Sequence, residues 1–257
     1  MKKILFFTTA ALLIVAASCG QLKKNNRSAT ESIEQTSDAT PFVRIKYNQP
    51  INGYNVEAIF MPEGVAFDFG DFLKIIGSAK LTFTHQDTHK KNEITSAHFA
   101  LPWQHFPDVF ENEEKFRAMV DEGEIESFAK GQTYNLDYKF FETPGITDEE
   151  WITSHPLYYG ELPFFFADVN FDGKNELILT KYREGQRGSN SYIVYSINPD
   201  GAFDEVIELP FDRLDDFSTI DSENKQIIIQ NSNGANDSFE EVYKQDQSGK
   251  FYLAKTQ

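Results

Sequence analysis

Cysteine is almost absent from this sequence, since Cys19 is the only one in 257 residues. A single cysteine cannot form an internal disulfide, although exported proteins often use such bonds. The remainder of the chain therefore has no thiol for catalysis and no thiolate for metal binding. Cys19 lies at the end of the first apolar segment, where a lipid anchor would be needed.

The sequence also has few positive charges compared with its negative ones. The chain has 24 basic and 40 acidic residues, for a formal net charge of −16. So acidic a protein is not suited to bind nucleic acid or anionic lipid headgroups through charge. The composition is compatible with a basic protein partner or with cations. The sequence also contains no nucleophile elbow, P-loop or dinucleotide fingerprint.

The N-terminus has the features of an export signal. Lys2 and Lys3 precede an apolar stretch at residues 4–17, which is shorter than the roughly 20 residues of a membrane-spanning helix and suits a signal peptide. Small residues then lead into Cys19, which resembles the lipobox of bacterial lipoproteins. The resemblance implies cleavage after residue 18, lipidation of Cys19 and a lipid-anchored location in the cell envelope, on the periplasmic face of a membrane or on the cell surface. An ordinary secretory signal or an uncleaved anchor is the alternative.

Beyond the signal, residues 19–40 contain no aromatic residue and few large aliphatic ones. Such a segment buries too little surface to offset its ordering entropy, so we expect a flexible tether. The folded body begins near residue 41 and draws its core from a chain with 24 Phe and 11 Tyr. We divide the body into an N-terminal region, residues 41–155, and a C-terminal region, residues 156–257.

Alternation of apolar and polar residues predicts that the body is mainly β. Turn sequences rich in Gly, Asn and Asp separate the apolar runs of the C-terminal region. This spacing favours an antiparallel meander, with a sandwich or a propeller-like sheet as its architecture. A helical segment is expected near residues 110–129, interrupted at Gly123. The predicted strands are residues 42–47, 56–60, 79–84, 93–100, 133–141, 162–167, 177–182, 192–197, 202–209, 226–230, 239–243 and 251–254.

One segment carries a pattern suited to metal chemistry. Asp168, Asn170 and Asp172 occupy alternate positions, followed by Gly173. Their oxygens can converge on a hard cation such as Ca²⁺, which takes six to eight oxygen ligands, if the chain curls around it. The glycine permits the sharp turn that faces the next carbonyl inward. The predicted ligands are Asp168, Asn170, Asp172, the carbonyl of Lys174, and Glu176.

The flanking sequence distinguishes this loop from an EF-hand. An EF-hand loop has a bidentate Glu at its twelfth position, where this chain has Leu179, and apolar strand-like runs replace the two helices. The strand–loop–strand form resembles the calcium loops of FG-GAP repeats in integrin-type β-propellers. A polar turn whose side chains merely accept hydrogen bonds from loop amides is the alternative.

Residues 156–257 as a whole are similar to calcium-binding periplasmic lysozyme inhibitors that act as immunity proteins. The similarity consists of the calcium pattern, the glycine-rich segment after it, the NPDG turn at residues 198–201, and the aromatic strands around Tyr243 and Gly249. It implies that a projecting loop enters the cleft of a hydrolase; an ordinary hairpin loop is the alternative. The residues at the matching position are Tyr182, Arg183, Glu184, Gly185, Arg187, Gly188 and Asn190.

These observations favour a binding role over catalysis, with inhibition of a basic, lysozyme-type hydrolase as the specific hypothesis. An accessory subunit of an envelope complex and a glycan or cell-wall hydrolase are the alternatives. Acidic residues are too numerous for any one pair to indicate a glycosidase. A zinc site at His85 and His89 would need both side chains on one helical face, whereas the sequence there indicates a strand followed by a turn.

Overall fold

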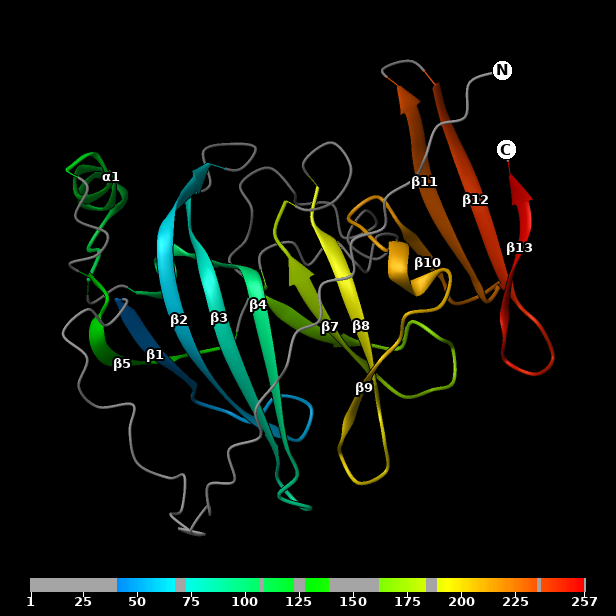
Figure 1. The fold of residues 1–257 in the computed structure, drawn as a ribbon, viewed down its shortest axis with the longest axis horizontal. Coiled ribbons are helices and arrows are strands. Elements are labelled where there is room, and N and C mark those ends of the chain that lie inside the picture. Colours follow the sequence, from blue (N-terminus) through cyan, green and yellow to red (C-terminus); the bar gives the residue numbers. More distant parts are fainter. Residues whose placement is uncertain are drawn as a thin grey trace, which may run out of the picture. The chain divides into compact units, whose positions relative to one another are not determined.

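The computed structural model describes residues 41–67, 73–106, 109–122, 128–138, 162–183, 189–234 and 237–256. Over these residues the protein is mainly β, as predicted, with three sheets in which almost every strand pairing is antiparallel (Figure 1). The described part of the chain has a single α-helix. None of its helices has the length and apolar character needed to span a membrane.

Sheet A is formed by five strands in the order β4-β3-β2-β1-β5. The pairing of β1 with β5 is parallel and the others are antiparallel. In β1 the side chains of Val43, Ile45 and Tyr47 are buried and those of Arg44 and Lys46 are exposed, which is the predicted alternation. The strands are β1 (Phe42–Tyr47), β2 (Tyr54–Phe67), β3 (Leu73–His85), β4 (Lys91–Pro102) and β5 (Lys130–Leu136).

Sheets B and C are four-stranded meanders in which each strand pairs with its neighbour in sequence. Sheet B contains β6 (Phe164–Ala167), β7 (Glu176–Lys181), β8 (Ser191–Ile197) and β9 (Phe203–Glu205). Sheet C contains β10 (Thr219–Asp221), β11 (Gln226–Gly234), β12 (Asp237–Gln245) and β13 (Phe251–Thr256). The described residues also contain two short 3₁₀ turns, η1 (Trp103–His105) and η3 (Phe211–Arg213), and the helix described below.

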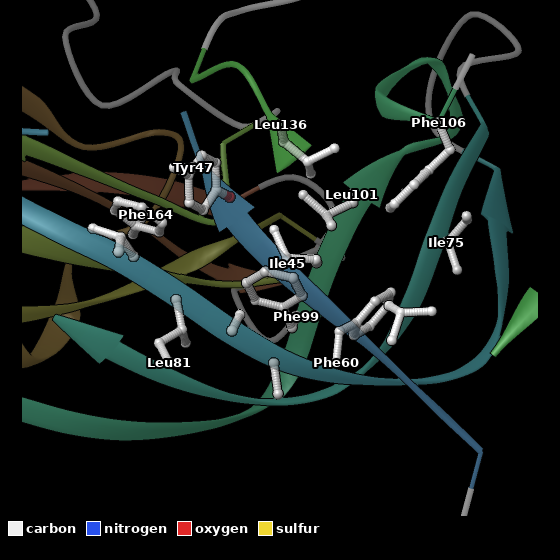
Figure 2. Close-up of a cluster of buried hydrophobic side chains, with 14 of the residues drawn as sticks. Ile45, Tyr47, Phe60, Ile75, Leu81, Phe99, Leu101, Phe106, Leu136 and Phe164 are labelled. Atoms are coloured by element: carbon white, nitrogen blue, oxygen red, sulfur yellow. The ribbon is translucent and has the colours of Figure 1, made fainter. Parts of the chain in front are cut away.

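The largest hydrophobic core joins sheet A to one face of sheet B. Phe164 of β6 and Leu177 and Leu179 of β7 belong to the same buried cluster as the inner side chains of β1 to β5. The ring of Phe164 lies 5.5 Å from that of Tyr47 and 5.1 Å from that of Phe83. Figure 2 shows part of this core, including Ile45, Phe60 and Leu101 of sheet A.

A second core joins the opposite face of sheet B to sheet C. Phe165 and Ile178, which alternate with the residues of the first core, pack with Ile227 and Ile229 of β11 and with Tyr243 of β12. Strand β7 is therefore buried on both faces, in agreement with the three consecutive apolar residues at its centre, 177–179. The two cores make the described body a layered packing of sheets, consistent with the predicted sandwich.

The predicted helical segment contains the α-helix of the described residues, which ends before Gly123, where the sequence predicts an interruption. Helix α1 (Glu113–Asp121) begins after Asn112, whose side chain accepts a hydrogen bond from the Lys115 N–H at 2.9 Å, the usual role of an N-cap. Phe116 anchors it by packing against Trp103 and Phe110. Residues 123–127 lie outside the described residues, and the chain after them leads into β5.

The bounds of three strands differ from the sequence prediction for physical reasons. The strand expected at residues 202–209 ends at Glu205, because the chain turns away toward η3 and leaves Ile207 and Leu209 exposed. Strands β2 and β3 extend well past their predicted ends. Their pairing continues through Pro62 and Gly77 by register shifts, so residues that usually interrupt strands are accommodated as bulges.

Gly77 is required by the close approach of β2 and β3 at this bulge. A Cβ atom at this position would lie 2.1 Å from the main-chain oxygen of Met61, a contact that cannot be relieved by side-chain movement. We expect Gly77→Ala to lower the free energy of unfolding by about 1–3 kcal/mol. Gly64→Ala is the control, since a Cβ atom there meets only Ile76 at 3.9 Å. Denaturant unfolding measures both, and equal stability of the two variants would contradict the steric argument.

Candidate calcium-binding loop

The 168–176 loop connects two strands, as predicted, and not two helices. It leaves β6 after Ala167 and enters β7 at Glu176. These two residues are directly paired in the antiparallel register, so the loop begins and ends at the same point of sheet B. The intervening residues must therefore curl back on themselves, which is the geometry that the spacing of polar residues anticipates.

The polar side chains of the loop turn inward over its backbone. Asp168 Oδ1 and Asn170 Oδ1 both accept a hydrogen bond from the Asp172 N–H, at 3.2 and 2.9 Å. Asp168 Oδ2 accepts from the Gly173 N–H at 2.9 Å. Asp172 Oδ1 accepts from the Lys174 N–H at 2.8 Å. These hydrogen bonds to loop amides are those of the alternative, a polar turn, and they also fold three of the predicted ligands back over one short segment.

Two residues of the loop adopt left-handed backbone conformations. Gly173 has φ of +84°, which glycine adopts without steric cost. Phe171 has φ of +62°, an uncommon value for an aromatic residue. Its ring packs against Phe251 of β13, with centroids 5.8 Å apart, and contributes to the second core. This packing offsets the backbone strain and holds the loop against sheet C.

Glu176 is the most deeply buried acid of the loop, with 3% of its surface exposed. Its carboxylate accepts hydrogen bonds from the Val169 N–H at 3.0 Å and from Asn170 Nδ2 at 2.8 Å. Burial raises the pKa of this carboxyl group to about 7, the hydrogen bond from Val169 opposes that shift, and the negative charges of Asp172 and Asp168 add to it. Three carboxylates therefore share one short loop at a cost in electrostatic energy.

The chemistry of these donors fits a hard cation. All five predicted ligands are oxygens, and a dication would offset the mutual repulsion of the three carboxylates. Within the described ranges, no ion pair includes Asp168, Asp172 or Glu176, and no three His, Cys, Asp or Glu side chains are arranged as a metal-holding group. The two remaining predicted ligands are the side-chain amide oxygen of Asn170 and the main-chain carbonyl of Lys174, which are not carboxylates. The present hydrogen bonds leave acceptor capacity on the carboxylates, since each has about four lone-pair positions.

The loop is tied to the other two sheets by amide side chains that sequence reasoning did not find. Gln245, the last residue of β12, donates from Nε2 to the main-chain oxygen of Asn170 at 2.8 Å and to that of Gly249 at 3.1 Å. Asn175 donates to the side chain of Asn52, before β2, at 3.4 Å. No local pattern marks Gln245, because its role depends on the distant position of β12.

The predicted partner-binding loop is described only at its two ends. Glu184, Gly185, Arg187 and Gly188 lie outside the described residues. Asn190 is buried and its Oδ1 accepts a hydrogen bond from the Arg183 N–H at 3.1 Å, which joins the two ends of the segment. The base of the loop is therefore closed by a direct hydrogen bond.

Asp216, a residue that sequence reasoning missed, supports this base from the segment before β10. Its Oδ2 accepts from the Asn190 N–H at 2.8 Å, and its own N–H donates to the Asn190 carbonyl at 3.1 Å. The Tyr192 hydroxyl also donates to its carboxylate. Burial raises the pKa of Asp216, while these hydrogen bonds and the charge of Lys74 act in the opposite direction.

Tyr182 lies between two cations at the other end of the loop. The Lys74 ammonium is 5.1 Å from the centre of its ring, and the Arg183 guanidinium is 5.3 Å from it. Lys74 is only 2% exposed, whereas Arg183 is exposed. The main-chain N–H of Tyr182 donates to the His98 carbonyl of β4 at 3.1 Å. Arg183 is thus the solvent-exposed cation among those predicted loop residues that the structure describes.

The remaining predicted residues are placed as follows. His85 ends β3 and packs against the Tyr54 ring at 5.0 Å, and His89 lies in the turn that follows. Cys19, the signal segment and the tether lie outside the described residues, as does the expected boundary near residue 155.

Comparison with known proteins gives a structural likeness but no sequence relative. No family model matches the sequence, and no curated protein matches it. The solved structure of a Xanthomonas type IV secretion system related protein is similar over 83% of this chain and 80% of that chain, with 12% sequence identity and a TM-score of 0.44. A likeness this distant supports no functional conclusion.

The buried carboxyl group of Glu176 predicts a pH dependence of the metal-free protein. Its pKa of about 7 in the folded state exceeds the ordinary value of 4.5. Its contribution to stability is therefore fully present below pH 4.5 and lost as the pH rises through 7. In chelator, we expect the melting temperature of the wild type to fall more between pH 5 and pH 8 than that of Glu176→Gln, which carries no titrating group there. Circular dichroism melts test this, and equal falls would contradict it.

Proposed function

We propose that this protein is a lipid-anchored, calcium-stabilised β protein of the bacterial cell envelope that acts by binding a partner. The observation that carries the proposal is the inward-turned set of oxygens in the 168–176 loop. Within one connection between paired strands, the side-chain oxygens of Asp168, Asn170 and the buried Glu176 accept hydrogen bonds from loop groups, and Asp172 accepts one from the Lys174 N–H. The lipobox-like sequence ending at Cys19 supports the anchored location.

Calcium would be held by the carboxylates of Asp168, Asp172 and Glu176, the side-chain oxygen of Asn170 and the carbonyl of Lys174. When bound, the ion supplies a compact double positive charge in a loop that carries three carboxylates. Oxygen-only donors favour calcium over zinc, which prefers His and Cys. The protein's own part is to pair β6 with β7 and to pack Phe171 against Phe251, so that the loop is formed before an ion arrives.

The partner in this proposal is a basic hydrolase of the lysozyme type. Its support is the resemblance of residues 156–257 to periplasmic inhibitors, together with the closed base of the 182–190 loop. The Asn190 side chain and Asp216 hold the loop ends together, and a loop whose ends are already joined loses less entropy when it binds. The net charge of −16 complements a cationic enzyme and would increase its rate of encounter.

An accessory subunit of an envelope complex is the second candidate, and one feature of sheet C favours it. Strand β13 is the last strand of its sheet and pairs only with β12 among the described strands. Tyr252 and Leu253 on this strand are 51% and 49% exposed. An edge strand with exposed apolar side chains is a common place for another protein to add a strand. In this role the protein would neither inhibit nor catalyse.

Calcium binding predicts that thermal stability depends on the ion. At a concentration 100-fold above the dissociation constant, we expect calcium to raise the melting temperature by about 5–10 °C relative to chelator. Asp168→Ala should remove this increase. Asp246→Ala is the matched control, because Asp246 accepts loop amides in the β12–β13 turn and belongs to no predicted ligand set. If the wild type melts at the same temperature with calcium and with chelator, the calcium proposal is wrong.

Inhibition predicts that the purified protein slows the lysis of cell walls by lysozyme. We expect Arg183→Ala to weaken inhibition about tenfold, because a charged contact at a buried interface is commonly worth that much. Arg117→Ala is the control. It also removes one positive charge, but from α1, outside the predicted partner-binding loop, and should leave inhibition unchanged. Release of glycan fragments by the protein alone would favour the hydrolase alternative. Normal lysis in its presence would eliminate the inhibitor role and leave the accessory subunit.

A further inference from the structure

The solvent-facing side of sheet A has a hollow of about 260 Å³ over strands β1, β2, β3 and β5. The residues that line it include Arg44, Lys46, Glu57, Ile59, Lys80 and Thr133. The strand register places Arg44 between Thr133 of β5 and Ile59 of β2, and places Lys80 of β3 on the far side of Ile59. One row across the sheet thus has two cations and no acidic side chain.

The charge of this hollow is opposite to that of the protein. Three cations and one carboxylate line it, in a chain whose net charge is −16. Lys46 is paired with Glu57 at 3.1 Å, and Lys80 is paired with Glu93 at 2.8 Å. Arg44 forms no ion pair with any acidic side chain in the described part of the chain. Its guanidinium is therefore the group in the hollow that is left to bind an anion.

The position of Arg44 is restricted by an aromatic ring. Its guanidinium carbon lies 5.2 Å from the centre of the Phe42 ring, a cation–π contact. The Phe42 ring in turn packs against the main chain of Gly131 in β5, where a Cβ atom would lie 3.4 Å from it. A planar guanidinium held in place presents two parallel N–H donors, which matches the geometry of a carboxylate.

The backbone over most of this face cannot pair with an added peptide strand. Strands β1, β2 and β3 are interior strands of sheet A, so their N–H and C=O groups are used by neighbouring strands, and only β5, at the margin of the hollow, is an edge strand. An added peptide strand needs a free sheet edge, and a peptide helix needs an apolar groove. Recognition here must come from side chains on a shallow face. Those side chains combine hydroxyls, from Thr82 and Thr133, with a flat aliphatic contact from Ile59.

We propose that this face of sheet A binds an acidic oligosaccharide, with a sugar carboxylate paired to Arg44. Neighbouring sugar hydroxyls meet Thr82, Thr133 and Glu57, and the apolar side of a sugar ring lies on Ile59. The charge complementarity resides in Arg44, and the Lys46 and Lys80 ammonium groups add to the positive potential. Nothing in this proposal depends on the 168–176 loop, so the failure of calcium binding or of inhibition would not decide it.

The experiment is a calorimetric titration of the purified full-length protein with galacturonic acid trimer at low salt. Maltotriose, a neutral trimer, and pentaglutamate, an acidic peptide, are titrated in parallel. We expect binding of the galacturonic acid trimer that weakens as salt is added, and little or no binding of the other two. Arg44→Gln should weaken binding about tenfold or more, and Arg44→Lys by a smaller factor because the fork is lost while the charge stays. Lys244→Gln on β12 removes one charge elsewhere and should bind as the wild type does.

Each remaining outcome overturns the proposal. If the galacturonic acid trimer does not bind, or binds equally well to Arg44→Gln, then sheet A has no such site. If pentaglutamate binds as tightly as the saccharide, the face recognises negative charge alone and not a sugar. Arg44 is exposed, so its replacement should not prevent folding, and a circular dichroism melt of each variant verifies this.

Discussion

Burial of β7 on both faces is the constraint on which the rest of the body depends. Leu177 and Leu179 enter the core shared with sheet A, and Ile178 enters the core shared with sheet C. The candidate sites lie at its two ends, because the buried Glu176 begins the strand and the Tyr182 ring follows it. Both are thus positioned by one strand that links two cores.

Much of the fold could be predicted because alternation is a local signal. Strand β1 matches its predicted range, and the turn residues separate the strands of sheets B and C. The parallel pairing of β1 with β5 could not be predicted, since it joins segments almost 90 residues apart and no turn marks it. The full lengths of β2 and β3 were missed for a different reason. A glycine such as Gly77 usually marks the end of a strand in a sequence. Here the glycine is needed within the strand, because β2 passes so close that the Met61 carbonyl leaves no room for a Cβ atom.

In the candidate sites, too, local patterns could be predicted from the sequence and long-range contacts could not. The spacing from Asp168 to Glu176 was sufficient to predict a polar loop between strands, because loop side chains bind amides of their own segment, while the convergence of its oxygens on a cation stays a prediction. Gln245 and Asp216 were missed, since each acts on a segment that is distant in sequence. The cationic hollow around Arg44 was hidden by the net charge, which averages over the whole chain. Net composition describes how a protein behaves in solution and says little about any one face.

The place of β1 in sheet A has a mechanical consequence. This strand follows directly on the expected tether and is hydrogen-bonded on both sides, to β2 and to β5. If Cys19 holds the chain in a membrane, any pull from the envelope first reaches an interior strand of the body, not a peripheral one. Extraction of that strand then requires two hydrogen-bond ladders to break, whereas a strand at the margin is held by one. The topology would let the anchored body bear load without unravelling from its attached end.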